Sequence, residues 1–276
     1  MRIDSHQHFW HYSQTEHTWM SDTMSTIRRD FLPEDLQPLL ASLNFDGCIA
    51  VQARQSLEET RWLLELADRF SFIKGVVGWL DLCSPELSTQ LRRFANHPKL
   101  VGVRHVVQDE PDDAFMLRPE FRHGIAQLQQ LGLTYDLLLF PKHIPAAVRL
   151  VEEFSDQPFV LDHIAKPSIA QGLISPWRED LQRLAQRPNV SCKLSGMVTE
   201  AKWKQWKPGD YRPYLDTVVE AFGSDRLMIG SDWPVCLLSS DYTSTMQLVI
   251  EYIQQFPEEA QAAILGGNCA RFYGID

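Results

Sequence analysis

Residue types that bind metal ions or move protons follow two apolar runs at opposite ends of the chain. His6 and His8 lie at the end of the first run, and Asp232 directly follows the last one. Alternate residues of a strand point to the same face, so both imidazoles can reach one metal ion or one substrate oxygen. A His-X-His pair is weak evidence by itself, and Ser231–Pro234 is also good turn sequence. If the first and last runs are neighbouring strands, the three residues meet at one mouth, which favours a hydrolase.

A third histidine, His163, ends another apolar run. A lone histidine in such a position is often a hydrogen-bonded core residue, but Pro167 ends the strand sharply here. We therefore expect His163 near the same mouth. Asp162 precedes it and should point to the opposite face, so we predict a structural role for Asp162.

Charged residues also interrupt two otherwise apolar runs. Arg104 and His105 are adjacent, so only one of them can face the interior of a barrel. We predict that Arg104 does so, as a donor to a carbonyl or carboxylate; a structural ion pair is the alternative. Lys193 raises the same question in its own run.

The elements that must position these residues alternate regularly along the chain. Several runs are solid apolar blocks, as expected of parallel strands buried on both faces. The eight predicted strands are Arg2–Gln7, Asp46–Ala53, Phe72–Leu82, Leu100–Gln108, Thr134–Phe140, Phe159–His163, Val190–Leu194 and Leu227–Ser231.

Helix signals separate these strands. Ser56 begins a capping box, and Pro85 and Pro176 each follow a serine and are predicted to lie just inside a helix. Further helices are predicted over 145–154, 214–222 and 258–273. The alternation predicts a single (β/α)₈ barrel domain over residues 1–276, with a doubly wound open sheet as the alternative. No G-x-G-x-x-G motif follows the first strand, which weakens that alternative.

Composition excludes several functional classes. The chain has 276 residues and a formal net charge of −10, which argues against nucleic-acid binding. No run has the length of a membrane helix, so no membrane association is expected. The five cysteines are scattered without a C-x-x-C pair, so a reduced, cytoplasmic location is the simplest expectation.

Three connections after strands are long, and two of them are rich in aromatic residues. They span Phe9–Leu32, Met197–Arg212 and Pro234–Thr243. In a barrel they would lie on the face where active sites occur. We predict that this region binds the substrate, with packing of the loops onto the barrel as the alternative for any single tryptophan. The candidate substrate-binding residues are Trp10, Trp79, Arg28, Lys193 and Trp233.

These motifs, in this order, resemble the amidohydrolase superfamily, and specifically its branch of sugar-lactone hydrolases that includes L-fuconolactonases and L-rhamnonolactonases. The segments that carry the resemblance are Ile3–Trp10, Gly75–Leu82, Val101–His105, Leu161–Pro167, Cys192–Gly196, Gly230–Val235 and Gly267–Gly274. The resemblance implies a (β/α)₈ barrel that opens the ring ester of an aldonolactone. It matches His6, His8, His163 and Asp232 to the family's site positions.

One departure from the superfamily pattern bears on metal binding. The fifth predicted strand, Thr134–Phe140, has no ligating residue near its C-terminal end, so a binuclear site is not expected. One divalent ion, best matched by Zn²⁺, could be held by some of His6, His8, His163 and Asp232. Similar proteins work without a metal, so the resemblance leaves its catalytic need open.

The expected mechanism uses Asp232 as general base on water, with Arg104, the three histidines or a bound metal stabilising the oxyanion. The expected partner is a small sugar lactone, and the first candidates are 6-deoxy sugar lactones such as L-fucono- or L-rhamnonolactone. A homo-oligomer, the ring size and the exact sugar stay open. Three rivals remain: a barrel decarboxylase, a hydrolase of a dicarboxylated pyrone lactone, and a non-catalytic sugar-binding barrel.

Overall fold

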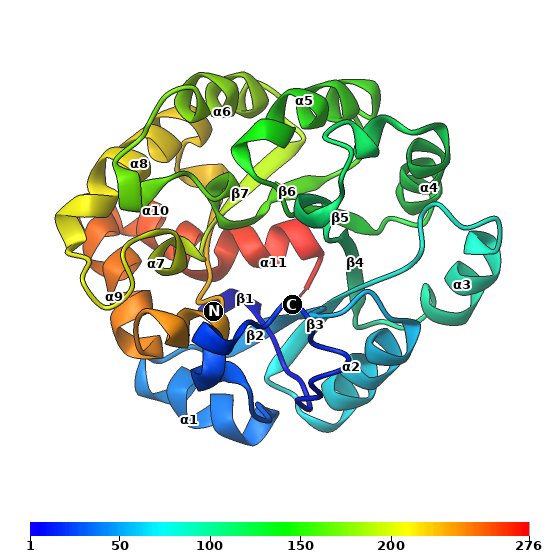
Figure 1. Ribbon diagram of the computed structural model, residues 1–276, viewed down its shortest axis with the longest axis horizontal. Helices are drawn as coiled ribbons and strands as arrows, with labels where there is room; N and C mark the ends of the chain where they lie inside the picture. The colour runs from blue at the N-terminus through cyan, green and yellow to red at the C-terminus, as the bar shows by residue number, and fades with distance from the viewer. Residues whose placement is uncertain (276) are drawn as a thin grey trace.

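Eight parallel strands, paired in chain order from β1 to β8, form the central sheet (Figure 1). The structure is a computed structural model that describes residues 1–275. The strands are β1 (Ile3–Gln7), β2 (Gly47–Val51), β3 (Ile73–Gly78), β4 (Leu100–His105), β5 (Thr134–Leu137), β6 (Phe159–Leu161), β7 (Val190–Leu194) and β8 (Leu227–Ile229). Asp232 N donates to His6 O at 2.8 Å, and His8 N donates to Trp233 O at 2.7 Å, which closes the barrel. The predicted barrel is confirmed, and the open sheet is wrong.

Helices surround the barrel and follow the strands in turn (Figure 1). They are α1 (Pro33–Ser42), α2 (Leu57–Arg69), α3 (Leu87–Phe94), α4 (Pro119–Gln130), α5 (Ile144–Glu153), α6 (Trp177–Ala185), α7 (Met197–Glu200), α8 (Pro208–Phe222), α9 (Tyr242–Ile253), α10 (Glu258–Ala262) and α11 (Asn268–Tyr273). Among the described residues, none of these helices is both long and apolar enough to cross a membrane.

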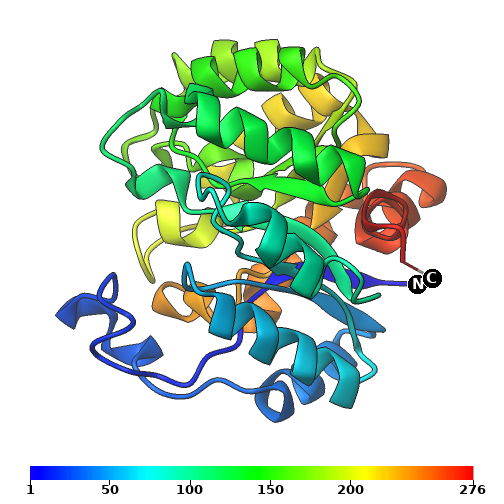
Figure 2. The ribbon, with the colours of Figure 1, turned by 90° about the vertical axis from the view of Figure 1, so that its right-hand side faces the viewer.

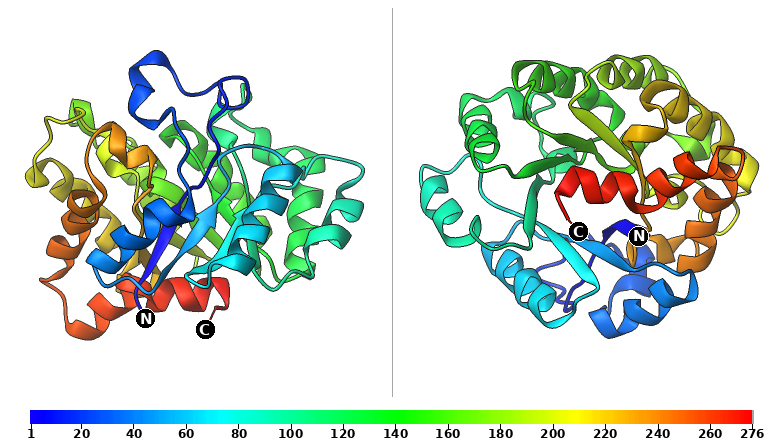
Figure 3. Two further views of the ribbon diagram at one scale, coloured as in Figure 1. Left: turned by 90° about the horizontal axis from the view of Figure 1, so that it is seen from below. Right: turned by 180° about the vertical axis from the view of Figure 1, so that it is seen from behind.

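Two apolar cores hold the layers together. The larger one lies between the strands and the surrounding helices. The smaller one lies within the barrel, where strand residues such as Ile3, Val77 and Val160 pack with Tyr273 of α11. Helix α11 crosses the end of the barrel at which both termini lie (Figure 3). The end of the barrel that α11 covers is thus packed mainly with apolar side chains.

A bulge in β1 gives the two N-terminal histidines their direction. Asp4 pairs with Cys48 of β2, but Gln7 pairs with Ala50, so β1 has one more residue than β2 between these pairs. After the bulge, His6 and His8 both lie close to Asp232 at the closing seam.

The first long connection stands above the end of the barrel that is opposite to the termini (Figure 2). Trp10 and Phe31 exchange backbone hydrogen bonds of 3.0 Å, so the loop begins and ends as a short antiparallel pair. The loop contains one 3₁₀ segment, Asp22–Ile27. The expected position of this loop at the C-terminal end of the strands is confirmed.

The sequence misplaced some element ends. Pro85 lies outside α3, whose first turn follows Glu86, and Pro176 is the residue before α6 rather than its first helical residue. The helix predicted over 258–273 is interrupted by a π-helical turn at Ala263–Gly267, where Gly266 has non-helical dihedral angles. Ser56 does cap α2 and accepts from Glu59 N at 3.3 Å.

Candidate active site

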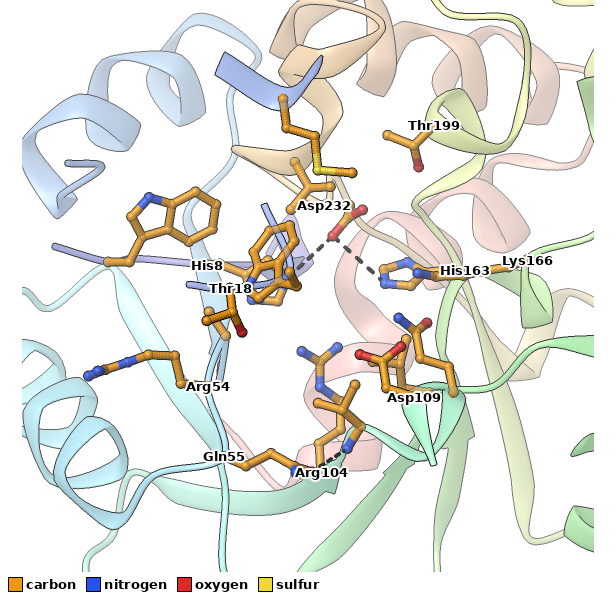
Figure 4. Close-up of a pocket in the computed structure, with 18 of the residues that line it drawn as sticks. His8, Thr18, Arg54, Gln55, Arg104, Asp109, His163, Lys166, Thr199 and Asp232 are labelled. Carbon is orange, nitrogen blue, oxygen red and sulfur yellow. Dashed lines mark hydrogen bonds and ion pairs between the residues drawn. The ribbon is translucent and has the colours of Figure 1, made fainter. Parts of the chain in front are cut away.

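A cavity of about 860 Å³ opens at the C-terminal ends of the strands (Figure 4). His8, Arg104, His163 and Asp232 lie in its wall, and Trp10 contributes from the first long loop. His6 lies beneath this surface and is fully buried. Residues from four different strand ends and both ends of the sequence therefore converge on one space.

Asp232 is the centre of this cluster. Its Oδ1 lies 3.3 Å from His8 Nε2, 3.7 Å from His163 Nε2 and 3.9 Å from His6 Nε2. Asp232 has a left-handed backbone with φ of 56°, a conformation that side chains other than glycine rarely adopt. Three imidazoles from two strands thus surround a single carboxylate oxygen.

The hydrogen bond on the far side of the His8 ring fixes its tautomer. His8 Nδ1 lies 2.8 Å from Val51 O, and a carbonyl oxygen can only accept, so Nδ1 carries the proton. In a neutral His8, Nε2 then has a lone pair that faces the oxygen of Asp232 at 3.3 Å. A proton on Nε2, or a cation between the two atoms, turns this contact from repulsive to attractive.

His163 reaches the cavity through an unusual backbone. The four residues His163, Ile164, Ala165 and Lys166 have φ values of 54°, 49°, 59° and 48°, all in the left-handed region. His163 Nδ1 lies 2.9 Å from Ser195 Oγ, which orients the ring. The left-handed turn breaks the alternation of a strand, so His163 and the residue before it both face the barrel interior.

Asp162 therefore does not point away from the site, and that part of the sequence prediction is wrong. Its carboxylate lies 3.2 Å from His6 Nδ1, 3.0 Å from Arg104 Nη1 and 3.0 Å from Lys193 Nζ. The residue is fully buried below the cavity. Asp162 holds the charged groups beneath the site in place. Its role is structural, as predicted, but it faces the interior of the barrel instead of pointing away from it.

Arg104 faces the interior, as predicted, while His105 packs on the ring of Phe115 with centroids 4.8 Å apart. The guanidinium of Arg104 donates to Gln52 O, to Gln52 Oε1 from two nitrogens, and to Asp162. Its remaining contact is Nη1 to His6 Nε2 at 3.3 Å. Every N–H of Arg104 is directed at a protein group. Arg104 therefore faces the interior as predicted, but its partners form the structural ion pair that was given as the alternative.

Lys193 does not contact the cavity, so its position contradicts a role in substrate binding. The side chain is fully buried, and its Nζ lies 2.5 Å from Asp136 Oδ2 and 3.0 Å from Asp162 Oδ1. Tyr273 of α11 donates to the same Asp136 oxygen at 2.8 Å. A buried ammonium needs such partners, and the cluster links α11 to the floor of the site.

Three other expected substrate-binding residues also lie outside the cavity wall among the described residues. Trp79 directs its indole N–H to His105 Nδ1 at 3.4 Å, and Trp233 is buried against the ring of Phe31. Arg28 donates to Asp22 and to a backbone carbonyl of its own loop. Each of these three side chains already has a protein partner, so in this structure they pack against or bond to the protein and do not line the cavity.

The electrostatic environment favours neutral forms of His6 and His163 and an ionised Asp232. Burial lowers the pKa of His163 to about 4 and holds the pKa of His6 well below its usual range. Burial alone would raise the pKa of Asp232, but His163, His8 and His6 outweigh it and hold that pKa below its ordinary value. Asp232 is therefore ionised near neutral pH.

Sequence reasoning missed Gln52 and Ser195, which hold Arg104 and His163 in place. Both are polar residues at the end of an apolar strand, the same signal that pointed to His6 and His163. It also missed Lys166 and Glu200 in the cavity wall, for which the sequence offered no periodic signal.

The cluster fits a divalent cation. One ligand atom each from His6, His8 and Asp232 lie within 4.8 Å of one another, and all three residues are buried. The unprotonated Nε2 of a neutral His8 is the form that binds metal. The expected fourth ligand, His163, lies near Asp232 but does not join the same group of three. The positive charge of Arg104, whose Nη1 lies 3.3 Å from His6 Nε2, would repel a metal ion bound to His6.

The amidohydrolase family model matches residues 3–275, which is nearly the whole chain. The chain belongs to the amidohydrolase family.

Two curated relatives match along their full lengths. The L-fucono-1,5-lactonase of Burkholderia multivorans is 40% identical over 286 residues, covering 100% of this chain and 96% of the relative. The L-fucono-1,5-lactonase of Burkholderia ambifaria is 38% identical over 281 residues, again covering 100% and 96%. A crystal structure of an amidohydrolase from Burkholderia multivorans with bound zinc has a TM-score of 0.96, with 40% identity and 100% of each chain covered.

Proposed function

We propose that this protein is a lactonase that opens the ring ester of a sugar lactone, with a 6-deoxy-L-sugar lactone as its substrate. One observation carries the proposal: Asp232 lies at the floor of a cavity among His6, His8 and His163, in a chain 40% identical to an L-fucono-1,5-lactonase. A lactone is an activated ester, and its hydrolysis needs a base for water and a stabilised oxyanion.

Asp232 is the proposed general base. Its carboxylate is held ionised by its neighbours, and one of its oxygens faces the cavity. It takes a proton from water as the water oxygen attacks the ester carbonyl, and then supplies that proton to the ring oxygen as the ester bond breaks. The product is the open-chain sugar acid, in which the former ring oxygen is a hydroxyl group. Each turnover therefore adds one free carboxylic acid.

His163 and Arg104 are the proposed stabilisers of the oxyanion. If Nδ1 of neutral His163 accepts from the Ser195 hydroxyl, its Nε2 carries a proton that can be donated into the cavity. Arg104 has no spare N–H, so it contributes its positive charge at the cavity floor rather than a direct hydrogen bond. Donors aimed at the oxyanion are each worth roughly 10²–10³-fold in rate.

We further propose that His6, His8 and Asp232 can hold one zinc ion. Bound there, the ion would supply Lewis-acid polarisation of the ester carbonyl. Arg104 already places a positive charge within 3.3 Å of His6 Nε2, which supports turnover without the metal.

The cavity wall disfavours a dicarboxylated substrate. Arg54 and Arg104 are its arginines among the described residues, and Arg104 is fully engaged by Gln52 and Asp162. The wall also contains the acidic residues Glu16, Asp109, Glu110 and Glu200. A neutral polyol suits this mixture of charges better than a dianion does.

A pH-indicator assay on a panel of lactones tests the proposal. L-Fucono- and L-rhamnono-lactones should release acid rapidly, and headspace analysis should detect no CO₂. A control without enzyme corrects for spontaneous opening of the ring. Release of CO₂ from an aromatic or unsaturated acid would instead identify a decarboxylase, and no turnover of any lactone would refute the proposed function.

A further inference from the structure

Two half-buried charged side chains in the cavity wall lack a protein partner among the described residues. Lys166 and Glu200 both line the cavity and are both half-buried. Among residues 1–275, neither the Lys166 ammonium nor the Glu200 carboxyl group takes part in a side-chain hydrogen bond or ion pair, although Lys166 Nζ lies 5.7 Å from the centre of the Phe140 ring. Partly buried charges are costly unless they are paired, so two charged groups without a protein partner in a cavity wall point to a ligand.

The backbone commits Lys166 to this position. It is the last residue of the left-handed turn that begins at His163, with φ of 48°. Left-handed residues other than glycine are strained, so the surroundings must hold the turn. Trp177 does so by donating its indole N–H to Ile164 O at 2.8 Å. The same turn delivers His163 and Lys166 to one wall, where Figure 4 shows them side by side.

Glu200 comes to the wall from the next strand end. It is the last residue of the short helix α7, which directly follows β7 and Gly196. Burial raises the pKa of the Glu200 carboxyl group, Lys166 lowers it, and Asp232 raises it. The carboxyl group is therefore within electrostatic reach of both the open ammonium and the proposed base.

We propose that Lys166 and Glu200 form a subsite that binds neighbouring hydroxyl groups of the lactone ring, an inference that rests on the proposed function. The ammonium can only donate hydrogen bonds, and an ionised carboxylate can only accept them. Each ring hydroxyl can do both, so two adjacent hydroxyls satisfy the pair while the ester carbonyl lies at Asp232. An anionic ligand would gain at Lys166 and lose at Glu200, which is why a neutral polyol fits.

The test compares a hydroxylated lactone with one that has no hydroxyls. L-Fucono-1,5-lactone and δ-valerolactone contain the same six-membered ring ester, and only the first offers hydroxyl groups to the subsite. We expect Lys166→Met and Glu200→Gln to lower kcat/KM for the sugar lactone by about 10- to 100-fold, mainly through KM. For δ-valerolactone the same variants should lose at least about tenfold less than for the sugar lactone, and the far-UV circular dichroism of each variant checks that it folds.

Lys202→Met and Glu220→Gln are matched controls on exposed positions, and both should keep wild-type rates on both lactones. Equal loss on the two lactones would overturn the subsite, because the residues would then act on the reaction centre. No loss on either lactone would overturn it as well.

A binding experiment separates this inference from the proposed function. Calorimetric titration with L-fucose, a neutral ring polyol, needs no turnover. Weaker binding by both variants than by wild type supports the subsite even if no lactone is hydrolysed. Equal binding by wild type and both variants, or no binding by wild type, overturns it.

Discussion

His8 Nε2 and Asp232 Oδ1 lie 3.3 Å apart although 224 positions separate the two residues in the sequence. Val51 O holds the other ring nitrogen of His8, and the backbone N–H of Asp232 donates to His6 O at 2.8 Å. The contact is therefore fixed from both sides by the seam that closes the barrel. In neutral His8 this contact sets a lone pair against the carboxylate oxygen, so a proton or a cation between the two atoms would stabilise it.

Asp232→Asn should remove the base and keep the shape of the side chain. We expect kcat to fall by about 10²–10⁴-fold, because positioned proton transfer contributes that much. Steady-state rates on the best lactone measure this, with Asp156→Asn at an exposed position as control. A variant that keeps a rate within about tenfold of wild type would rule out Asp232 as the base.

The acid limb of activity should lie at unusually low pH. The pKa of His163 is lowered to about 4, and that of Asp232 is held below its ordinary value, so both groups lose their protons well below neutrality. The active, deprotonated form is then present above about pH 5 and is lost as the pH falls through about 4. A profile of kcat/KM from pH 3 to 8 tests this, and a limb near pH 6.5 would contradict it.

Gly196→Ala should displace His163. A Cβ at this position would lie 2.4 Å from His163 Nδ1, and Gly196 has φ of +62°. Gly172 has a similar φ of +66° with nothing within 4 Å, so Gly172→Ala carries the backbone cost alone.

Both glycine variants should lose about 1–2 kcal/mol in the free energy of unfolding from the left-handed backbone. Only Gly196→Ala should also lose activity, by about 100-fold, since small misplacements at a reaction centre are costly. Urea unfolding and lactone turnover separate the two effects. Equal activity of the two variants would mean that the site tolerates movement of His163.

Glu59 should make the fold less stable as the pH rises. Burial raises the pKa of Glu59 from 4.5 to about 7, so the folded state binds this proton more tightly than the unfolded state does. The stabilisation is fully present below pH 4.5 and is lost as the pH rises through 7, which amounts to about 3 kcal/mol.

The free energy of unfolding in urea at pH 5 and pH 8 measures this loss. In Glu59→Gln the side chain no longer titrates, so the difference between the two pH values should shrink by about the same amount. An unchanged difference would show that other groups set the pH dependence.

Zinc binding should depend on His8. Equilibrium dialysis should find about one ion per chain in the wild type and weaker binding in His8→Gln, because Nε2 of His8 is the prepared ligand atom. His123→Gln at an exposed position is the control. Equal zinc binding by His8→Gln and wild type would exclude these residues as the metal site.

The barrel could be predicted from the sequence because its strands are solid apolar blocks. Val190–Leu194 was predicted to the residue, and the other strands were found with ends that ran too long. At β6 the overrun covers the point where the chain leaves the sheet and the polar residues of the site begin. His163 lies beyond this point, since β6 stops at Leu161 and a left-handed turn follows.

Side-chain partners could not be predicted in the same way. Alternation placed Asp162 on the wrong face, because the left-handed backbone after it cannot be recognised from residue types. Lys193 was expected to bind substrate, but its partners are Asp136 on β5 and Asp162 directly after β6. A charge inside a strand shows that a partner exists, and only the packed structure shows whether that partner is protein or ligand.

The seam between the first and last strands also sets an order of events during synthesis. The ribosome releases His6 and His8 first, and Asp232 more than two hundred residues later. Until then the histidines lack the Asp232 carboxylate, and the edges of the first and seventh strands lack their neighbour. No growing chain that stops short of Trp233 holds a complete reaction centre, so hydrolytic activity and barrel closure should appear in the same step.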